Sequence, residues 1–264
     1  MNSKSYGVCR LSVVPVRADA SHKSEQVTQM LFGDHYTVLD ESKDSAWKKI
    51  LIHADQYEGW IDGNQHSSVT AEFFEYINQA EFKITTDVTS SLLFNKTPVM
   101  LLLGSILHIS GSELFKMEDQ FAFNGDSKSI GQKREFEFIK NVAYKYLNAP
   151  YMWGGKSPFG VDCSGFLQMV FRIGGYQLQR DAWQQAKQGR EVDTFDHARP
   201  GDLAFFSNEE GRVHHVGLYL GNGKIIHASG RVRVDSLTHE GIIQNETNRR
   251  SHLLSHFRRI LAEA

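Results

Sequence analysis

One of only two cysteines in the chain, Cys163, lies in the stretch GVDCSGF at residues 160–166. Asp162 precedes it, and the apolar run LQMVFRI that follows predicts a helix that begins near the cysteine. The free N–H groups and the dipole of a helix N-terminus favour negative charge, and the thiolate is the nucleophilic form of cysteine. The pattern indicates a nucleophile whose neighbouring N–H groups could hold an oxyanion. The alternative is a buried structural thiol, which free cysteines commonly are.

A cysteine nucleophile needs a base, and imidazole is the usual one. His214, His215 and His227 lie in VHHVGLYLGNGKIIHAS, which predicts a β-hairpin. A two-residue loop at Asn222 and Gly223 would place His215 and His227 on opposite faces, because side chains alternate. If His215 is the base and His227 orients it, the loop should have three residues, with Gly223 in the left-handed region, His215 and His227 on one face and His214 pointing away. A zinc site made of the three histidines is a weaker alternative, because adjacent strand residues do not easily share one ion.

The elements on the N-terminal side of these motifs are mostly strands. Short apolar runs separated by turn residues over 8–62 predict a small β-barrel. Residues 70–80, TAEFFEYINQA, predict a connecting helix, and strand patterns return more loosely over 81–125. A second small barrel is the expectation for this region.

The pattern changes from residue 136 onward. Helices are predicted at 135–147, 163–176 and 180–189, and strands follow at 201–207, 214–221, 224–229, 232–237 and 256–261. Helices followed by strands within one domain indicate the α+β class. The predicted nucleophile would then lie on a helix and the predicted base on the sheet.

Composition and length limit the classes of protein that the chain can belong to. It has 264 residues, of which 41% are hydrophobic and 23% charged, with a formal net charge of −2. The absence of a basic surplus argues against nucleic acid as a partner. This length fits two or three domains.

The N-terminus and the cysteine content bear on the compartment. Residues 1–17 contain no apolar core of signal-peptide length, and no run of about 18 apolar residues predicts a membrane span. Cys9 and Cys163 do not form a disulfide framework. We therefore expect a cytoplasmic protein, or a periplasmic or secreted one if a leader has been removed.

Four motifs occur together and in order in the C-terminal half: APYMWGGKSPFGVDCSGFLQMVF, LQRDAWQQAKQG, RPGDLAFF and HHVGLYLGNGKIIHAS. They resemble the NlpC family of bacterial cell-wall cysteine peptidases. VPVRADASHKSEQVTQMLFGDHY and YEGWID are similar to the paired SH3-like domains of one branch of that family. The resemblance implies a multidomain fold, in which two small all-β SH3-like barrels precede an α+β papain-like catalytic domain. The expected boundaries are a first barrel at 1–66, a linker helix at 67–80, a second, divergent barrel at 81–127 and the peptidase at 128–264.

The resemblance also implies the roles of the catalytic residues. Cys163 would be the nucleophile, His215 the general base and His227 the residue that orients it, while Tyr151 would hydrogen-bond near the thiolate. The family acts on peptidoglycan stem peptides. In this branch the bond cleaved joins γ-D-glutamate to a diamino acid, typically meso-diaminopimelate, and a free N-terminal L-alanine is required. No cofactor or metal is expected, and we expect a monomer.

A substrate with a free ammonium group needs an anion at a fixed distance from the scissile bond. Asp162 is the first candidate, and a helix cap is its alternative role. Ser164 and the backbone around Asp181 and Ala182 are candidates to bind the α-carboxylate of D-glutamate. Arg180 is ranked lower, as a surface charge.

Two residues of the first SH3-like domain complete the expected site. Glu25 and Tyr57 are expected to close the far end of the substrate pocket, and solvated loop residues are the alternative for both.

Three functions follow from these expectations. The first is a cytoplasmic enzyme that trims murein peptides during cell-wall recycling, because intact wall caps the L-alanine amine with muramic acid. The second is a wall-binding SH3-like module joined to an inactive papain-like domain, against which the matched cysteine and histidines argue. The third is an amidase or acyltransferase, which dependence on a free amine would distinguish from the first.

Overall fold

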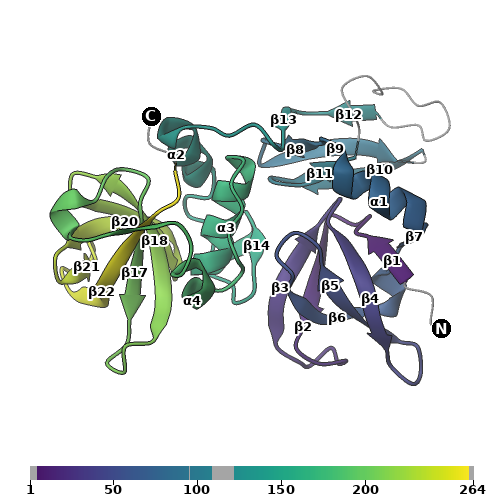
Figure 1. Cartoon of the computed structure of the whole chain (residues 1–264), viewed down its shortest axis with the longest axis horizontal. Coiled ribbons are helices and arrows are strands. Elements are labelled where there is room, and N and C mark those ends of the chain that lie inside the picture. The colour runs from purple at the N-terminus through teal and green to yellow at the C-terminus, as the bar shows by residue number, and fades with distance from the viewer. Residues whose placement is uncertain (1–4, 95, 109–121, 262–264) are drawn as a thin grey trace. The chain divides into compact units, whose positions relative to one another are not determined.

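The structure is a computed structural model that describes residues 5–94, 96–108 and 122–261. The chain divides into two compact units. The first comprises residues 1–132 together with 153–158, and the second comprises 133–152 and 159–264. Figure 1 shows strands throughout the first unit, and helices together with a large sheet in the second.

The first half of the first unit is a seven-stranded antiparallel sheet in the order β3-β2-β6-β5-β4-β1-β7. Alternating burial along β2 and β5 directs one face into a core that includes Val14, Val16, Ile50 and Ile52. This is the SH3-like all-β region that the sequence predicts. Its strands are β1 (Ser5–Val8), β2 (Val13–Arg17), β3 (Gln26–Leu31), β4 (His35–Glu41), β5 (Trp47–Ile52), β6 (Glu58–Asp62) and β7 (Ser68–Val69), with a 3-10 turn at Gly63–Gln65.

The predicted connecting helix is present as α1 (Ala71–Gln79), and the Thr70 side chain caps it by accepting from the N–H of Phe73. Two three-stranded sheets follow, in the orders β10-β9-β12 and β11-β8-β13. Residues 109–121 of the expected second barrel lie outside the described residues. The strands are β8 (Lys83–Thr85), β9 (Thr89–Phe94), β10 (Thr97–Leu102), β11 (Ile106–Leu107), β12 (Ala122–Asn124) and β13 (Ser127–Ser129).

Two of the three helices of the second unit match the predicted ones. They are α2 (Phe136–Lys145) and α3 (Cys163–Ile173), which contact each other. The third was expected over 180–189 but is a single turn, α4 (Ala182–Gln185). Within the described residues, no helix combines the length and the hydropathy needed to cross a membrane.

The sheet of the second unit runs in the order β16-β22-β17-β18-β19-β20-β21, and β21 also pairs with β22. That extra pairing closes six of the strands into a ring. Its apolar interior includes Phe206, Tyr219, Ile225 and Phe257. The strands are β16 (Arg190–Val192), β17 (Leu203–Ser207), β18 (Val213–Gly221), β19 (Lys224–Ser229), β20 (Arg231–Thr238), β21 (Gly241–Ile243) and β22 (Arg250–Arg259), with a 3-10 turn at Phe195–His197.

The segment before the nucleophile is divided between the units. Residues 153–158, which include β14 (Lys156–Ser157), belong to the first unit, while β15 (Gly160–Val161) belongs to the second. The backbone N–H of Lys156 donates to Gln29 Oε1 at 2.9 Å, and Gln26 Nε2 donates to the carbonyl of Trp153 at 3.1 Å. This exchange of residues between the units was not predicted from the sequence.

Candidate active site

Cys163 is the first residue of α3, as the sequence predicts. Asp162 is the N-cap, and its Oδ1 accepts from the N–H of Gly165 at 2.7 Å. An N-cap of this kind satisfies one of the free N–H groups of the first turn. The helix is buried along almost its whole length, and this fixes the position of the cysteine.

The thiol of Cys163 lies against β18 beside His215. Its Sγ is 4.0 Å from the carbonyl oxygen of His214, and the N–H groups of Val216 and Ser164 point toward the sulfur. His215 is therefore the residue between the two β18 backbone groups that contact the thiol. The pairing of a helix cysteine with a sheet histidine agrees with the prediction.

His215 and His227 lie on one face of the hairpin, as predicted. His215 Nε2 is 2.9 Å from His227 Nδ1, and the two rings are nearly perpendicular, at 83°. Both side chains are buried, with exposed fractions of 4% and 0%. The other ring nitrogen of His227, Nε2, forms a hydrogen bond with Asp235 Oδ2 at 3.1 Å. Asp235 was not singled out from the sequence, in which VRVDSL shows only a strand.

The predicted three-residue loop is wrong, although the face that it was meant to explain is right. Gly221 pairs with Lys224, so the loop has two residues, Asn222 and Gly223, both with positive φ. The register shifts by one residue between Tyr219 and Gly221, which leaves Leu220 as a bulge. The bulge reverses the alternation of side chains and returns His215 and His227 to the same face.

Burial controls the protonation of the catalytic pair. It raises the pKa of the Cys163 thiol to about 12, and the neighbouring Asp162 carboxylate contributes further, against the N–H groups of Val216 and Ser164. Burial and the adjacent imidazoles hold the pKa of His215 well below its ordinary value. Burial therefore favours the neutral thiol and the neutral imidazole over their charged forms.

Tyr151 lies close enough to Cys163 and Asp162 for their negative charges to affect its pKa. Burial raises the pKa of its phenol to about 12, and Cys163 and Asp162 raise it further. The hydroxyl therefore remains protonated at neutral pH and can donate a hydrogen bond. Tyr151 keeps 37% of its surface exposed, so that its ring is accessible from solvent.

Asp162 is paired with Arg180, which was ranked as a surface charge and is instead only 1% exposed. Both terminal nitrogens of Arg180 donate to the Asp162 carboxylate, one of them to Oδ1 at 3.1 Å. The same Nη1 donates to Ser164 Oγ at 3.0 Å. Asp162 thus has the capping role that was its alternative. Its role toward a substrate ammonium group stays a prediction, as does that of Ser164 toward a carboxylate.

Asp181 and Ala182 are at the start of α4, where the N–H of Asp181 donates to Gln184 Oε1 at 3.0 Å. Gln185 joins this turn to the nucleophile helix, because its Nε2 donates to the carbonyl of Ser164 at 3.0 Å. The structure therefore brings the backbone of 181–182 near Ser164. Its binding role stays a prediction.

Glu25 and Tyr57 belong to the first unit. Glu25 is exposed and its carboxylate accepts a hydrogen bond from Trp153 Nε1. The N–H of Tyr57 donates to Asp55 Oδ1 at 3.2 Å. Their part in substrate binding stays a prediction.

His252, on β22, was passed over in the sequence and is part of the histidine cluster. Its ring stacks on His215 with centroids 4.1 Å apart at an angle of 24°. His215, His227 and His252 offer nitrogens within 4.8 Å of one another, a set with the chemistry of a zinc site. Two stacked rings direct their in-plane lone pairs side by side rather than toward one point, so that this arrangement is not a tetrahedral ligand set. His214, proposed in the zinc alternative, is exposed.

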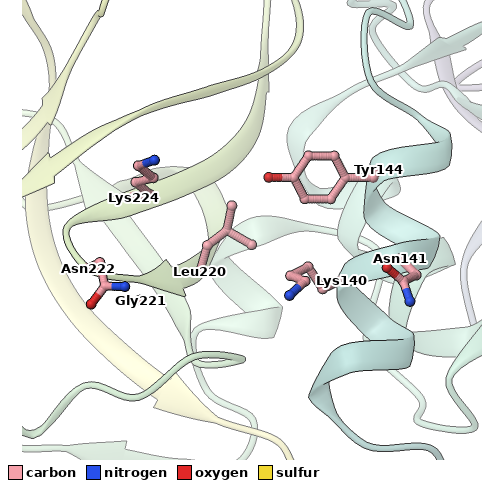
Figure 2. Close-up of a pocket in the computed structure, with 7 residues that line it drawn as sticks. All are labelled: Lys140, Asn141, Tyr144, Leu220, Gly221, Asn222 and Lys224. Carbon is pink, nitrogen blue, oxygen red and sulfur yellow. The ribbon is translucent and has the colours of Figure 1, made fainter.

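A pocket beside the β18–β19 turn is separate from the candidate catalytic residues. It lies between α2 and the β18–β19 turn, and none of the predicted site residues lines it (Figure 2). The lining residues are Lys140, Asn141, Tyr144, Leu220, Gly221, Asn222 and Lys224.

Known proteins match this chain over both of its units. The sequence profile of the NlpC/P60 family matches residues 148–251, and that of the bacterial dipeptidyl-peptidase Sh3 domain matches residues 16–65. A gamma-D-glutamyl-L-lysine dipeptidyl-peptidase from Bacillus cereus is 30% identical over 255 residues, which cover 86% of this chain and 75% of that protein. The chain belongs to the NlpC/P60 family.

Further matches agree with this NlpC/P60 assignment. Dipeptidyl-peptidase 6 of Lysinibacillus sphaericus is 29% identical over 83% of this chain and 87% of its own length. The crystal structure of an NlpC/P60 family protein from Bacillus cereus superposes with a TM-score of 0.82 at 23% identity, over 98% of this chain and 100% of that one. The protein is thus an NlpC/P60 cysteine peptidase with an SH3-like N-terminal region.

Proposed function

We propose that this NlpC/P60 protein is an endopeptidase that cleaves the γ-D-glutamyl–diamino acid bond of murein stem peptides with a free N-terminal L-alanine. Cys163 is the nucleophile, His215 the general base and acid, and His227 the residue that orients His215. The observation that carries the proposal is the hydrogen bond between His227 on β19 and His215 on β18, the strand that contacts the Cys163 thiol.

The reaction is an acyl transfer in two steps. The Cys163 sulfur attacks the γ-carbonyl carbon of D-glutamate while His215 takes the thiol proton. The tetrahedral oxyanion accepts hydrogen bonds from backbone N–H groups at the start of α3. The C–N bond then breaks, and the proton passes from His215 to the leaving amine. Water, deprotonated by His215, hydrolyses the thioester and releases the carboxylate and the free thiol. Because burial favours the neutral form of both groups, the proposal has proton transfer accompany the attack.

The names of two relatives support both the proposed scissile bond and the proposed free N-terminus of the substrate. The Bacillus cereus and Bacillus subtilis proteins are both named gamma-D-glutamyl-L-lysine dipeptidyl-peptidase. A dipeptidyl-peptidase removes two residues from a free N-terminus, which fits a requirement for unblocked L-alanine. The diamino acid after the scissile bond is proposed as meso-diaminopimelate, with L-lysine as the comparison.

A free L-alanine amine also bears on the place of the enzyme in the cell. Intact peptidoglycan carries that nitrogen as an amide of muramic acid, so that an amidase-type reaction must first release the peptide. We therefore place the enzyme after such a step, in the recycling of murein peptides in the cytoplasm, and as a monomer.

The test is hydrolysis of L-Ala-γ-D-Glu-meso-diaminopimelate, its L-lysine analogue and the N-acetylated form of each, followed by mass spectrometry. We expect cleavage after D-glutamate in the free peptides only, and none with Cys163→Ala. Equal cleavage of the acetylated peptides would place the enzyme on intact wall and overturn the recycling role. If no peptide is cleaved, a wall-binding module or an amidase replaces the proposal.

A further inference from the structure

We propose that Asp235 is a fourth, positioning residue of the active site, which holds the proton of His227 on Nε2 and so leaves Nδ1 of His215 bare for the Cys163 thiol. The inference deepens the proposed function, on which it rests for the role of His215. It goes beyond the cysteine and two histidines to which that function assigns the chemistry.

The first step concerns the carboxylate of Asp235, which is surrounded by donors. Oδ1 accepts from Arg233 Nη2 and from the backbone N–H of Asn245, each at 3.0 Å. Oδ2 is 2.8 Å from Arg233 Nε and 3.1 Å from His227 Nε2. The side chain has no exposed surface. These contacts, chiefly the hydrogen bond from His227, hold the pKa of Asp235 down at about 2 against its burial. Asp235 is therefore an ionised group that can only accept.

The second step passes from Asp235 to the two rings. Because Oδ2 can only accept, a singly protonated His227 ring carries its proton on Nε2, and its Nδ1 is then an acceptor. His227 Nδ1 faces His215 Nε2 at 2.9 Å, so His215 must carry its proton there. The remaining nitrogen of His215, Nδ1, has its lone pair available. That atom is the base that the proposed reaction needs.

The third step is that three neighbouring strands of the sheet carry the three hydrogen-bonded residues. His215 is on β18, His227 on β19 and Asp235 on β20, and the three strands are adjacent in the sheet. His227 pairs directly with Arg233, and Asp235 pairs with Ile225, two residues along β19 from His227. Asp235 and Arg233 therefore share a face with His227. Glu246 holds Arg233 from the far side, at 3.3 Å from Nη1.

The decisive variant is Asp235→Asn, because the site dictates how the new amide must turn. The Oδ1 position faces Arg233 Nη2 and a backbone N–H, neither of which can become an acceptor. The Oδ2 position faces one such donor, Arg233 Nε, but also His227 Nε2, which can become an acceptor. The amide nitrogen is therefore expected at the Oδ2 position, where it donates to His227 Nε2. His227 must then hold its proton on Nδ1 and donate to His215, which forces the proton of His215 onto Nδ1, against the thiol. The base is occupied although the fold is kept.

Asp235→Ala separates this effect from a loss of structure. It removes the buried carboxylate partner of Arg233 and leaves only Glu246 on the exposed side, and so should destabilise the protein more than Asp235→Asn. It does not impose the wrong tautomer, however, and should retain more activity. Asp202→Asn is the matched control, because Asp202 is also buried and also bound by an arginine, Arg259, at 2.7 Å. It should lower stability and leave both the tautomers and turnover unchanged.

Two measurements test the proposal on the full chain. The ¹⁵N shifts of the ring nitrogens, measured without substrate, should show protonated Nε2 on both histidines in the wild type and protonated Nδ1 on both in Asp235→Asn. The value of kcat/KM should fall on the order of 10²–10⁴-fold in Asp235→Asn, as for other carboxylates that fix a catalytic tautomer. Asp235→Ala should lose less.

The outcomes that overturn the proposal are equally defined. If the wild-type His215 carries its proton on Nδ1, or if the tautomers are the same in Asp235→Asn, the proposal is wrong. It is also wrong if Asp235→Asn is more active than Asp235→Ala. Failure of the wild type to cleave any murein peptide would overturn the proposed function, while the nitrogen shifts would still decide the role of Asp235.

Discussion

Gly217 and His227 face each other across the β18–β19 ladder, and the missing side chain at 217 leaves room for the imidazole. A Cβ on Gly217 would lie 2.5 Å from Cδ1 of Ile225 and 3.0 Å from Cβ of His227. The glycine is therefore required for space rather than for its backbone angles. The empty position leaves room for the Ile225 side chain and for Cβ of His227.

Gly217→Ala should therefore crowd Ile225 and His227 and lower both activity and stability. We expect a loss on the order of 10-fold or more in kcat, because a shift of a few tenths of an ångström lengthens the His215–His227 hydrogen bond. Crowding should lower the free energy of unfolding by about 1–3 kcal/mol. Steady-state kinetics and urea unfolding check both values. Gly211→Ala is the control for activity, since nothing lies within 4 Å of a Cβ there and full activity is expected, although the positive φ of Gly211 (+77°) should lower its stability.

Deleting Leu220 tests the bulge that sets the register of the hairpin. Without this residue the two-residue loop would continue as a regular ladder, which places His215 and His227 on opposite faces. The expected outcome is a folded protein that has lost turnover and in which His215 and His227 no longer couple in NMR spectra. Turnover at the wild-type level would show that the bulge does not position the pair. Leu220→Ala keeps the bulge and should remain active.

Parts of this site could be predicted from the sequence because their signals are local. DCSG before an apolar run predicted the position of Cys163 at the start of a helix, and the hairpin pattern allowed His215 and His227 to share a face. The loop length was wrong because a bulge and a longer loop both add one residue. Sequence spacing leaves both arrangements of the two histidines open, and the shared face was expected only because His215 and His227 were assumed to act as a pair.

The residues that were missed act through contacts distant in the sequence. Asp235 reaches His227 across one strand pair, and His252 reaches His215 from a strand near the C-terminus. Arg180 was interpreted as a surface charge because a single arginine in a polar segment usually is. Its burial results from the Asp162 carboxylate, 18 residues earlier.

Arg180→Met should be strongly destabilising because it leaves the Asp162 carboxylate buried without its cation. Breaking a buried pair from one side costs about 3–5 kcal/mol, and the start of α3 should shift with it. Guanidinium unfolding measures the loss. Arg212→Ala, which removes an exposed pair with Glu210, is the control and should change stability by less than about 1 kcal/mol.

A double variant separates the charge from the packing of Arg180. Asp162→Asn keeps a capping side chain and removes the buried charge. Arg180→Met combined with Asp162→Asn should therefore be more stable than Arg180→Met alone. If the two losses simply add, the carboxylate and the guanidinium do not stabilise each other, and the buried pair is not the reason for the position of Arg180.

His252 should make the protein less stable in acid. Burial, together with the neighbouring imidazoles of His227 and His214, lowers its pKa from 6.5 to about 4. The folded state thus resists protonation where the unfolded state accepts it, so the free energy of unfolding should fall as the pH drops from 6.5 toward 4. His252→Phe keeps a ring on His215 and removes this titration. The free energy of unfolding of His252→Phe should equal that of the wild type near pH 7.5. Near pH 4.5 it should be about 1–2 kcal/mol higher, after allowance for the partial exposure of His252. Urea unfolding across this range measures the difference. His239→Phe, at a residue with a 70% exposed side chain, should follow the wild-type curve. Parallel curves for the wild type and His252→Phe would show that His252 is not the group that titrates.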